Sequence, residues 1–125
     1  MLSAGDVRGT LIFDEVDVGV GGRTAGVVGR KLWALARTHQ VLCVTHLPQV
    51  AAYADSHLLV SKQVRDGKSQ TQVARLEAEA RVAELAAMLA GPQPSESALR
   101  NARELLDRAR AEKDRSGPLP KERPA

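Results

Sequence analysis

The chain has 125 residues, a net charge of +3 and one cysteine, Cys43. This length allows one domain or part of one, and a single cysteine excludes an internal disulfide, which favours a reducing compartment. No apolar run approaches membrane-spanning length and no signal peptide is evident, so we expect a cytoplasmic protein without membrane contact. The mild positive charge is compatible with nucleic-acid contact but does not argue for it.

After a predicted loop over residues 1–9, the stretch 10–17 is a short apolar run that ends in carboxylates. The apolar part is too brief for a helix and predicts a strand buried on both faces, as in a parallel sheet. The carboxylates are Asp14, Glu15 and Asp17. At the carboxyl end of such a strand, one acid can hold Mg²⁺ and a second can orient an attacking water, as in the Walker B motif of nucleotide hydrolases. A strand that runs into a solvated loop explains the stretch equally well.

Three glycines follow within four residues, at Gly19, Gly21 and Gly22. They permit positive φ and close backbone approach, so the segment suits a loop near a phosphate or a partner chain. A flexible turn between a strand and a helix is the alternative. No Lys-Ser/Thr follows, so this is not a phosphate-binding P-loop.

Residues 23–38 predict a helix, because Val28, Leu32 and Leu35 form one apolar stripe. Residues 41–45 predict a second buried strand, and the three elements together make a βαβ unit with parallel strands. His46 then lies at the same sheet edge as Asp14. A lone histidine is more often structural than catalytic, but at this edge it can hydrogen-bond a γ-phosphate or the attacking water.

The remaining pattern predicts a hairpin and helices. Asp66-Gly67 favours a type I′ turn, Gly91-Pro92 ends a helix, and Ser95 is a plausible N-cap for the last helix. The predicted elements are a short helix over 48–54, strands over 57–64 and 69–76, helices over 77–90 and 95–110, and a disordered basic, proline-rich tail over 111–125. The predicted fold class is α/β: a parallel βαβ unit followed by a β-hairpin and C-terminal helices.

Two motifs together carry a family resemblance. They are Leu-Ile-Phe-Asp-Glu-Val-Asp-Val-Gly-Val-Gly-Gly over 11–22 and Val-Leu-Cys-Val-Thr-His-Leu-Pro-Gln-Val-Ala over 41–51. The chain resembles the RecN family of bacterial DNA repair ATPases, which are SMC-like and ABC-type, from about residue 10 to residue 110. Either motif alone would suggest only an ABC-type ATPase.

The resemblance implies a role for each matched residue. Asp14 is similar to the Walker B aspartate that supports Mg²⁺, through water, and Glu15 to the catalytic glutamate that polarises the attacking water. His46 is similar to the switch histidine that senses the γ-phosphate. Asp17 and the glycines through Gly22 are similar to the D-loop, which meets a second head across an ATP sandwich. The family acts in recombinational repair of double-strand breaks, which implies ATP, Mg²⁺, a homodimeric partner head, DNA for the full-length parent and a nucleoid-associated location.

The chain departs from the family pattern in what it lacks. The sequence contains neither Gly-x-x-x-x-Gly-Lys-Ser/Thr, nor a Ser-Gly-Gly signature, nor sustained heptads. We therefore expect the C-terminal part of one ATPase head over 10–110, with a truncation point in residues 1–9. Unpaired sheet edges and uncovered apolar faces should follow, and the chain alone should not bind ATP tightly or hydrolyse it.

Two further hypotheses differ in class. The chain is a non-catalytic interaction module that docks on an intact RecN-like head, or it is a small basic DNA-binding protein. The second is weaker, because the sequence has no aromatic stacking platform, recognition-helix motif or concentrated basic face. Changing Glu15 to Gln separates the enzyme from the docking module, since only turnover depends on that carboxylate.

Overall fold

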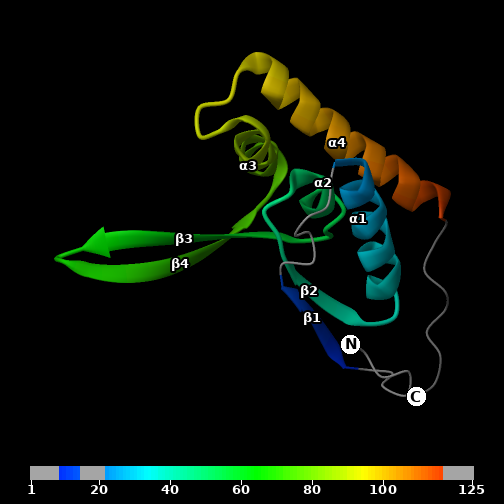
Figure 1. The fold of residues 1–125 in the computed structure, drawn as a ribbon, viewed down its shortest axis with the longest axis horizontal. Coiled ribbons are helices and arrows are strands. Elements are labelled where there is room, and N and C mark those ends of the chain that lie inside the picture. The colour runs from blue at the N-terminus through cyan, green and yellow to red at the C-terminus, as the bar shows by residue number, and fades with distance from the viewer. Residues whose placement is uncertain (1–8, 15–21, 117–125) are drawn as a thin grey trace.

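The computed structural model describes residues 9–14 and 22–116 of the chain, which form a mixed α/β fold (Figure 1). Among these residues, none of the helices has the length and apolar character needed to cross a bilayer. The elements in chain order are β1 (Thr10–Asp14), α1 (Gly22–Ala36), β2 (Gln40–Val44), α2 (Pro48–Ala51), β3 (His57–Arg65), β4 (Lys68–Leu76), α3 (Ala78–Ala90) and α4 (Glu96–Arg115). The predicted fold class, with its βαβ unit, hairpin and C-terminal helices, is confirmed.

β1 and β2 form a parallel pair, and α1 connects them and packs beside β2 (Figure 1). The register places Leu11 opposite Val41 and Asp14 opposite Val44. Because the strands are parallel, their carboxyl ends lie at the same edge of the sheet. The predicted βαβ unit is therefore present.

The two faces of this sheet differ in exposure. Leu11 is buried, whereas the next residue, Ile12, is 69% exposed, and Leu42 and Val44 on β2 are exposed as well. The prediction of a strand buried on both faces is therefore wrong for the described residues: side chains alternate between faces, and only the face toward α1 is covered. The uncovered apolar face that we expect for a sheet without further neighbours is present.

β3 and β4 form a long antiparallel hairpin that projects away from α1, β1 and β2 (Figure 1). Its turn has φ of 51° at Asp66 and 74° at Gly67. Both central residues of a type I′ turn need positive φ, so the predicted turn is confirmed. Nearly all side chains along the hairpin are exposed.

The main core lies where α2, α3 and α4 meet. Leu85 is fully buried, and the residues around it are mostly alanines, which let the helices approach closely. The predicted N-cap is confirmed, because the Ser95 hydroxyl accepts a hydrogen bond of 3.2 Å from the Ala98 N–H. Val82 and Ala86 on α3 and Ala102 and Leu106 on α4 are buried, whereas Leu89 is exposed.

α4 continues to Arg115, five residues beyond its predicted end at residue 110. Residues 111–115, predicted to belong to the tail, are thus helical. The cause is tertiary contact: Glu112 and Lys113 in these last turns bind side chains from other parts of the fold. Such contacts stabilise the last turns of the helix.

Candidate functional site

The candidate site begins at the carboxyl ends of β1 and β2. Asp14 is the last residue of β1 and lies opposite Val44, and His46 follows Val44 by two residues. Both Asp14 and His46 are exposed. The fold therefore brings these two predicted residues to one edge of one parallel sheet, which is where α/β proteins bind ligands.

A local turn sets the position of His46. The Thr45 Oγ1 accepts a hydrogen bond of 3.0 Å from the Leu47 N–H, and Pro48 begins α2 directly afterwards. A hydroxyl that binds the backbone two residues ahead bends the chain, and proline is well suited to the first turn of a helix. His46 thus lies within a defined turn at the edge of the sheet.

Four of the predicted site residues lie outside the described residues. They are Glu15, Asp17, Gly19 and Gly21. Gly22 is the first residue of α1, so the predicted glycine-rich segment leads into that helix. The roles of these five residues stay predictions.

The described residues are compatible with Mg²⁺ held through one carboxylate. Across residues 9–14 and 22–116, no three His, Cys, Asp or Glu side chains are grouped so that they could hold a metal ion. Mg²⁺ in nucleotide sites commonly keeps several waters and takes one or two carboxylates plus substrate phosphates. The exposed carboxylate of Asp14 at the sheet edge fits that requirement, and no dedicated protein cage is needed.

Gly29 on α1, which was not predicted as a site residue, allows the two helices of the site to approach closely. A Cβ at Gly29 would lie 2.7 Å from Cδ2 of Tyr53, 3.1 Å from the Gln49 carbonyl oxygen and 3.2 Å from the Val50 Cα. The small, buried pair Ala25 and Gly29, four residues apart on α1, was an available signal of close packing. α1 starts at the glycine segment and α2 starts after His46, so this contact couples both sides of the site.

The last turns of α4 bind α1 and the segment that follows α2. The Tyr53 hydroxyl donates a hydrogen bond to Glu112, and Arg30 on α1 lies 3.7 Å from the Glu112 carboxylate. Lys113 donates to Asp55 at 2.8 Å, and its ammonium lies 5.6 Å from the centre of the Trp33 ring. Burial, followed by the bond to Glu112, raises the pKa of Tyr53 to about 12. We call Glu112 and Lys113 with these partners the α4 latch.

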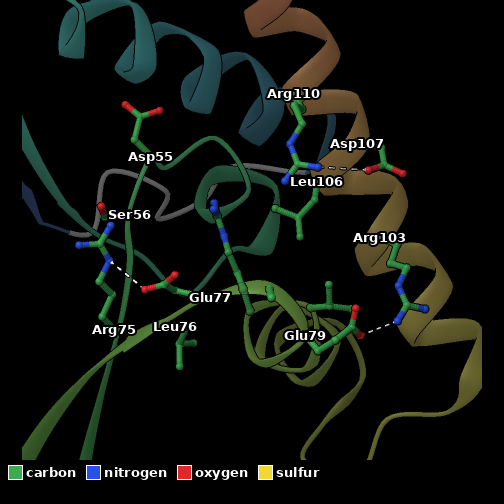
Figure 2. Close-up of a pocket in the computed structure, with 13 residues that line it drawn as sticks. Asp55, Ser56, Arg75, Leu76, Glu77, Glu79, Arg103, Leu106, Asp107 and Arg110 are labelled. Atoms are coloured by element: carbon green, nitrogen blue, oxygen red, sulfur yellow. Dashed lines mark hydrogen bonds and ion pairs between the residues drawn. The ribbon is translucent and has the colours of Figure 1, made fainter.

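A separate pocket of about 390 Å³ lies between the start of α3, α4 and the loop before β3 (Figure 2). Its charges are balanced, and Figure 2 shows ion pairs of Arg75 with Glu77, Arg103 with Glu79 and Arg110 with Asp107. Its lining contains four arginines (Arg75, Arg81, Arg103, Arg110), four carboxylates (Asp55, Glu77, Glu79, Asp107) and no predicted site residue. Paired charges of this kind do not favour one sign of ligand, so we assign the pocket a structural role.

Arg81 explains part of that structural role. Its Nη2 donates to the carbonyl oxygens of Ala51 at 3.1 Å and Ala54 at 2.7 Å, just where α2 ends. Burial, and then the charge of Arg110, lowers the pKa of Arg81. A cation at a helix C-terminus is favourable, so Arg81 joins α3 to α2.

No protein-family model matches the chain. DNA repair protein RecN of Mycobacterium leprae is 62% identical over 104 residues, which are 83% of this chain and 17% of that relative. RecN of Vibrio cholerae is 57% identical over 97 residues, which are 78% of this chain and 18% of that relative. RecN of Bacillus subtilis is 46% identical over 100 residues, which are 80% of this chain and 17% of that relative. The chain thus spans about a sixth of the length of these relatives.

Among solved structures, one described as "Structural biochemistry of ATP-driven dimerization and DNA stimulated activation of SMC ATPases" gives a TM-score of 0.47 at 22% identity. The structural match covers 57% of this chain and 42% of the chain in that structure. Over about four fifths of its length the chain is similar to part of DNA repair protein RecN, and the resemblance to the RecN family that its two motifs predict is confirmed.

Proposed function

We propose that this chain contributes a Walker B strand, a D-loop and a switch histidine to the ATP-hydrolysing head of a RecN-type protein, as its C-terminal part. The observation that carries the proposal is the parallel register of β1 and β2, which brings Asp14 and His46 to one sheet edge. The similarity to RecN supports the same assignment. The biological role is recombinational repair of DNA double-strand breaks, in the cytoplasm and in association with the nucleoid.

Each residue has a distinct task in this proposal. Asp14 holds Mg²⁺ through water, and the ion, when bound, neutralises charge on the nucleotide phosphates. Glu15 accepts a hydrogen bond from the attacking water and takes its proton as general base. His46 donates a hydrogen bond to the γ-phosphate of ATP. The turn set by Thr45 and Pro48 holds the His46 backbone in place for this contact.

The glycine-rich segment supplies the contact with a second head. Asp17, Gly19, Gly21 and Gly22 form the D-loop, and glycine permits the close backbone approach that such an interface needs. α1 follows directly and is held by Gly29 and the α4 latch. The partner is therefore a second copy of the same head, and the full-length parent engages DNA.

The test is a chimera in which this chain replaces the matched segment of Mycobacterium leprae RecN. We expect DNA-stimulated ATP hydrolysis by the chimera, and a loss of kcat of roughly 100-fold or more on Glu15→Gln, because a general base contributes at least that much. Glu15→Gln should retain ATP binding and accumulate a dimer on size-exclusion chromatography. His46→Ala should also lower kcat.

Glu104→Gln is the matched control, because Glu104 is an exposed carboxylate on α4. It should leave turnover unchanged. Normal turnover by the Glu15→Gln chimera would contradict the proposal. The chain by itself should show no saturable ATP binding, since the sequence has no phosphate-binding Gly-x-x-x-x-Gly-Lys-Ser/Thr motif.

One observation favours a second function, a non-catalytic module that docks on an intact RecN-type head. Ile12, Leu42 and Val44 are exposed on one face of the parallel sheet. Exposed apolar patches often mark interaction sites. In that case Glu15→Gln would leave co-purification with the intact head unchanged, and no chimera would be needed for binding.

A further inference from the structure

The outer half of the hairpin carries cations that no described carboxylate pairs with. We call residues 61–72 the hairpin tip. Its cations are Lys62, Arg65 and Lys68, its single carboxylate is Asp66, and all four side chains are exposed. None of the three cations forms an ion pair within the described part of the chain. Elsewhere in that part, ion pairs with carboxylates are formed by Arg30, Arg75, Arg103, Arg110, Lys113 and Arg115. The hairpin tip therefore presents positive charge to an anion outside this chain.

Two of these cations lie directly opposite each other. The antiparallel register pairs Arg65 on β3 with Lys68 on β4, on either side of the turn. Like charges at directly opposite positions destabilise a strand pair, whereas opposite charges stabilise it. This arrangement costs stability in the chain by itself, and an anion bound beside the two side chains would remove the cost.

The distribution of the cations indicates the shape of that anion. Successive side chains of a strand point to opposite faces, so Lys62 lies on the opposite face of the hairpin from Arg65 and Lys68. A flat anionic surface would meet only one of these faces. A groove with phosphates along both walls meets both, and the major groove of B-DNA, about 12 Å wide, admits a two-stranded β-ribbon.

The length and the polar side chains of the hairpin fit the same ligand. The hairpin projects from the body of the fold, and its strands of nine residues span about 30 Å at about 3.4 Å per residue (Figure 1). The face that carries Arg65 also carries the exposed amides of Gln63, Gln70 and Gln72. Duplex DNA presents phosphates for the cations and base edges for the amides within one groove, which favours it over an acidic protein segment.

We propose that the hairpin tip enters the major groove of duplex DNA and that Lys62, Arg65 and Lys68 contact phosphates. The contact is mainly electrostatic, so it should depend strongly on salt and weakly on base sequence. It needs no nucleotide, because none of these residues belongs to the ATP site proposed above. This inference rests on the proposed function, since it names the surface through which the chain meets the DNA of its parent.

The experiment titrates the full chain, without nucleotide, into a fluorescent DNA duplex of about 30 base pairs at about 50 to 200 mM salt and follows anisotropy. We expect binding that weakens as salt rises. The triple variant Lys62→Gln, Arg65→Gln, Lys68→Gln should weaken binding by about tenfold or more at the lowest salt. It should also reduce the slope of log affinity against log salt by about 2.7, because each phosphate contact contributes about 0.9.

The matched control removes the same charge from the body of the fold. It is the triple variant Lys31→Gln, Arg100→Gln, Arg108→Gln, at exposed positions on α1 and α4. These three cations, like those of the hairpin tip, form no ion pair with a described carboxylate. The control should keep the affinity within about twofold and leave the salt slope unchanged. Both variants change exposed residues only, so their thermal unfolding should match that of the unchanged chain.

Three outcomes would overturn the inference. They are no binding at about 50 mM salt, equal weakening by the control variant, and competition by polyglutamate as effective as that by unlabelled duplex. The second would show that only net charge matters, and the third that an acidic protein segment is an equal partner. Failure of the proposed function gives a different result: duplex binding with the expected variant effects, but a chimera without ATP turnover, contradicts the function and leaves the hairpin contact in place.

Discussion

At the scale of single residues, the contact between α1 and α2 depends on Gly29. The Tyr53 ring and the backbone of Gln49 and Val50 occupy the space that a Cβ would need. Gly26, also on α1, has no such restriction, because a Cβ there would meet no atom within 4 Å. Gly26 and Gly29, which lie on one helix, therefore offer a matched pair of substitutions.

Gly29→Ala should lower the free energy of unfolding by about 1–2 kcal/mol, because the overpacking cost exceeds the gain in helix propensity. Gly26→Ala should raise it by up to about 1 kcal/mol, since only the propensity gain applies. Chemical denaturation of the two variants checks both signs. Equal stabilisation by the two substitutions would show that α1 and α2 can separate without cost.

At the scale of elements, the α4 latch holds the last turns of α4 against the rest of the fold. The Glu112 carboxylate accepts a hydrogen bond from the Tyr53 hydroxyl and lies near the guanidinium groups of Arg30 and Arg115. Its negative charge and its hydrogen bond both raise the pKa of Tyr53, after burial. Tyr53 is the only tyrosine in the chain, so its titration can be followed directly.

Glu112→Gln should lower the pKa of Tyr53 from about 12 toward its ordinary value of 10.0. The unchanged protein should lose stability as the pH rises from 10.0 through about 12, because the folded state holds the phenol proton more tightly than the unfolded state. Phenolate absorbance against pH measures the shift. Glu104→Gln on the same helix is the control, and an unchanged Tyr53 pKa in Glu112→Gln would contradict the latch.

At the scale of the whole molecule, His57 is partly buried at the start of β3, where the hairpin leaves the body of the fold. Its pKa is lowered by burial and then by the charge of Arg81, and no described group bonds its Nδ1. Below the ordinary pKa of 6.5 the unfolded chain takes up a proton that the folded chain resists. The stability of the fold should therefore fall as the pH drops from 6.5 to the lower folded pKa.

His57→Gln should remove this part of the pH dependence. Chemical denaturation between about pH 8 and about pH 5 compares the variant with the unchanged chain. Glu84 has a raised pKa and contributes the opposite slope in both proteins, so their difference isolates His57. An equally steep loss of stability in the variant would show that another group is responsible.

Local features of the fold could be predicted from the sequence because their signals lie within a few residues. The apolar runs predicted the parallel strands, Asp66-Gly67 predicted the turn, and Ser95 predicted the helix cap. The parallel arrangement then placed Asp14 and His46 at one edge. Glu15 and the D-loop residues before Gly22 stay predictions, since they lie outside the described residues.

The sequence by itself determined the order of the elements and their local geometry, since side-chain periodicity, turn chemistry and capping act over a few residues. Only the tertiary structure decided which faces are covered and where α4 ends. The latch contacts Tyr53–Glu112 and Asp55–Lys113 join residues 59 and 58 positions apart, a separation at which no local pattern operates. The exposure of Leu42 and Val60 likewise depends on which neighbours a strand has, because an apolar strand has the same sequence whether or not its second edge is paired.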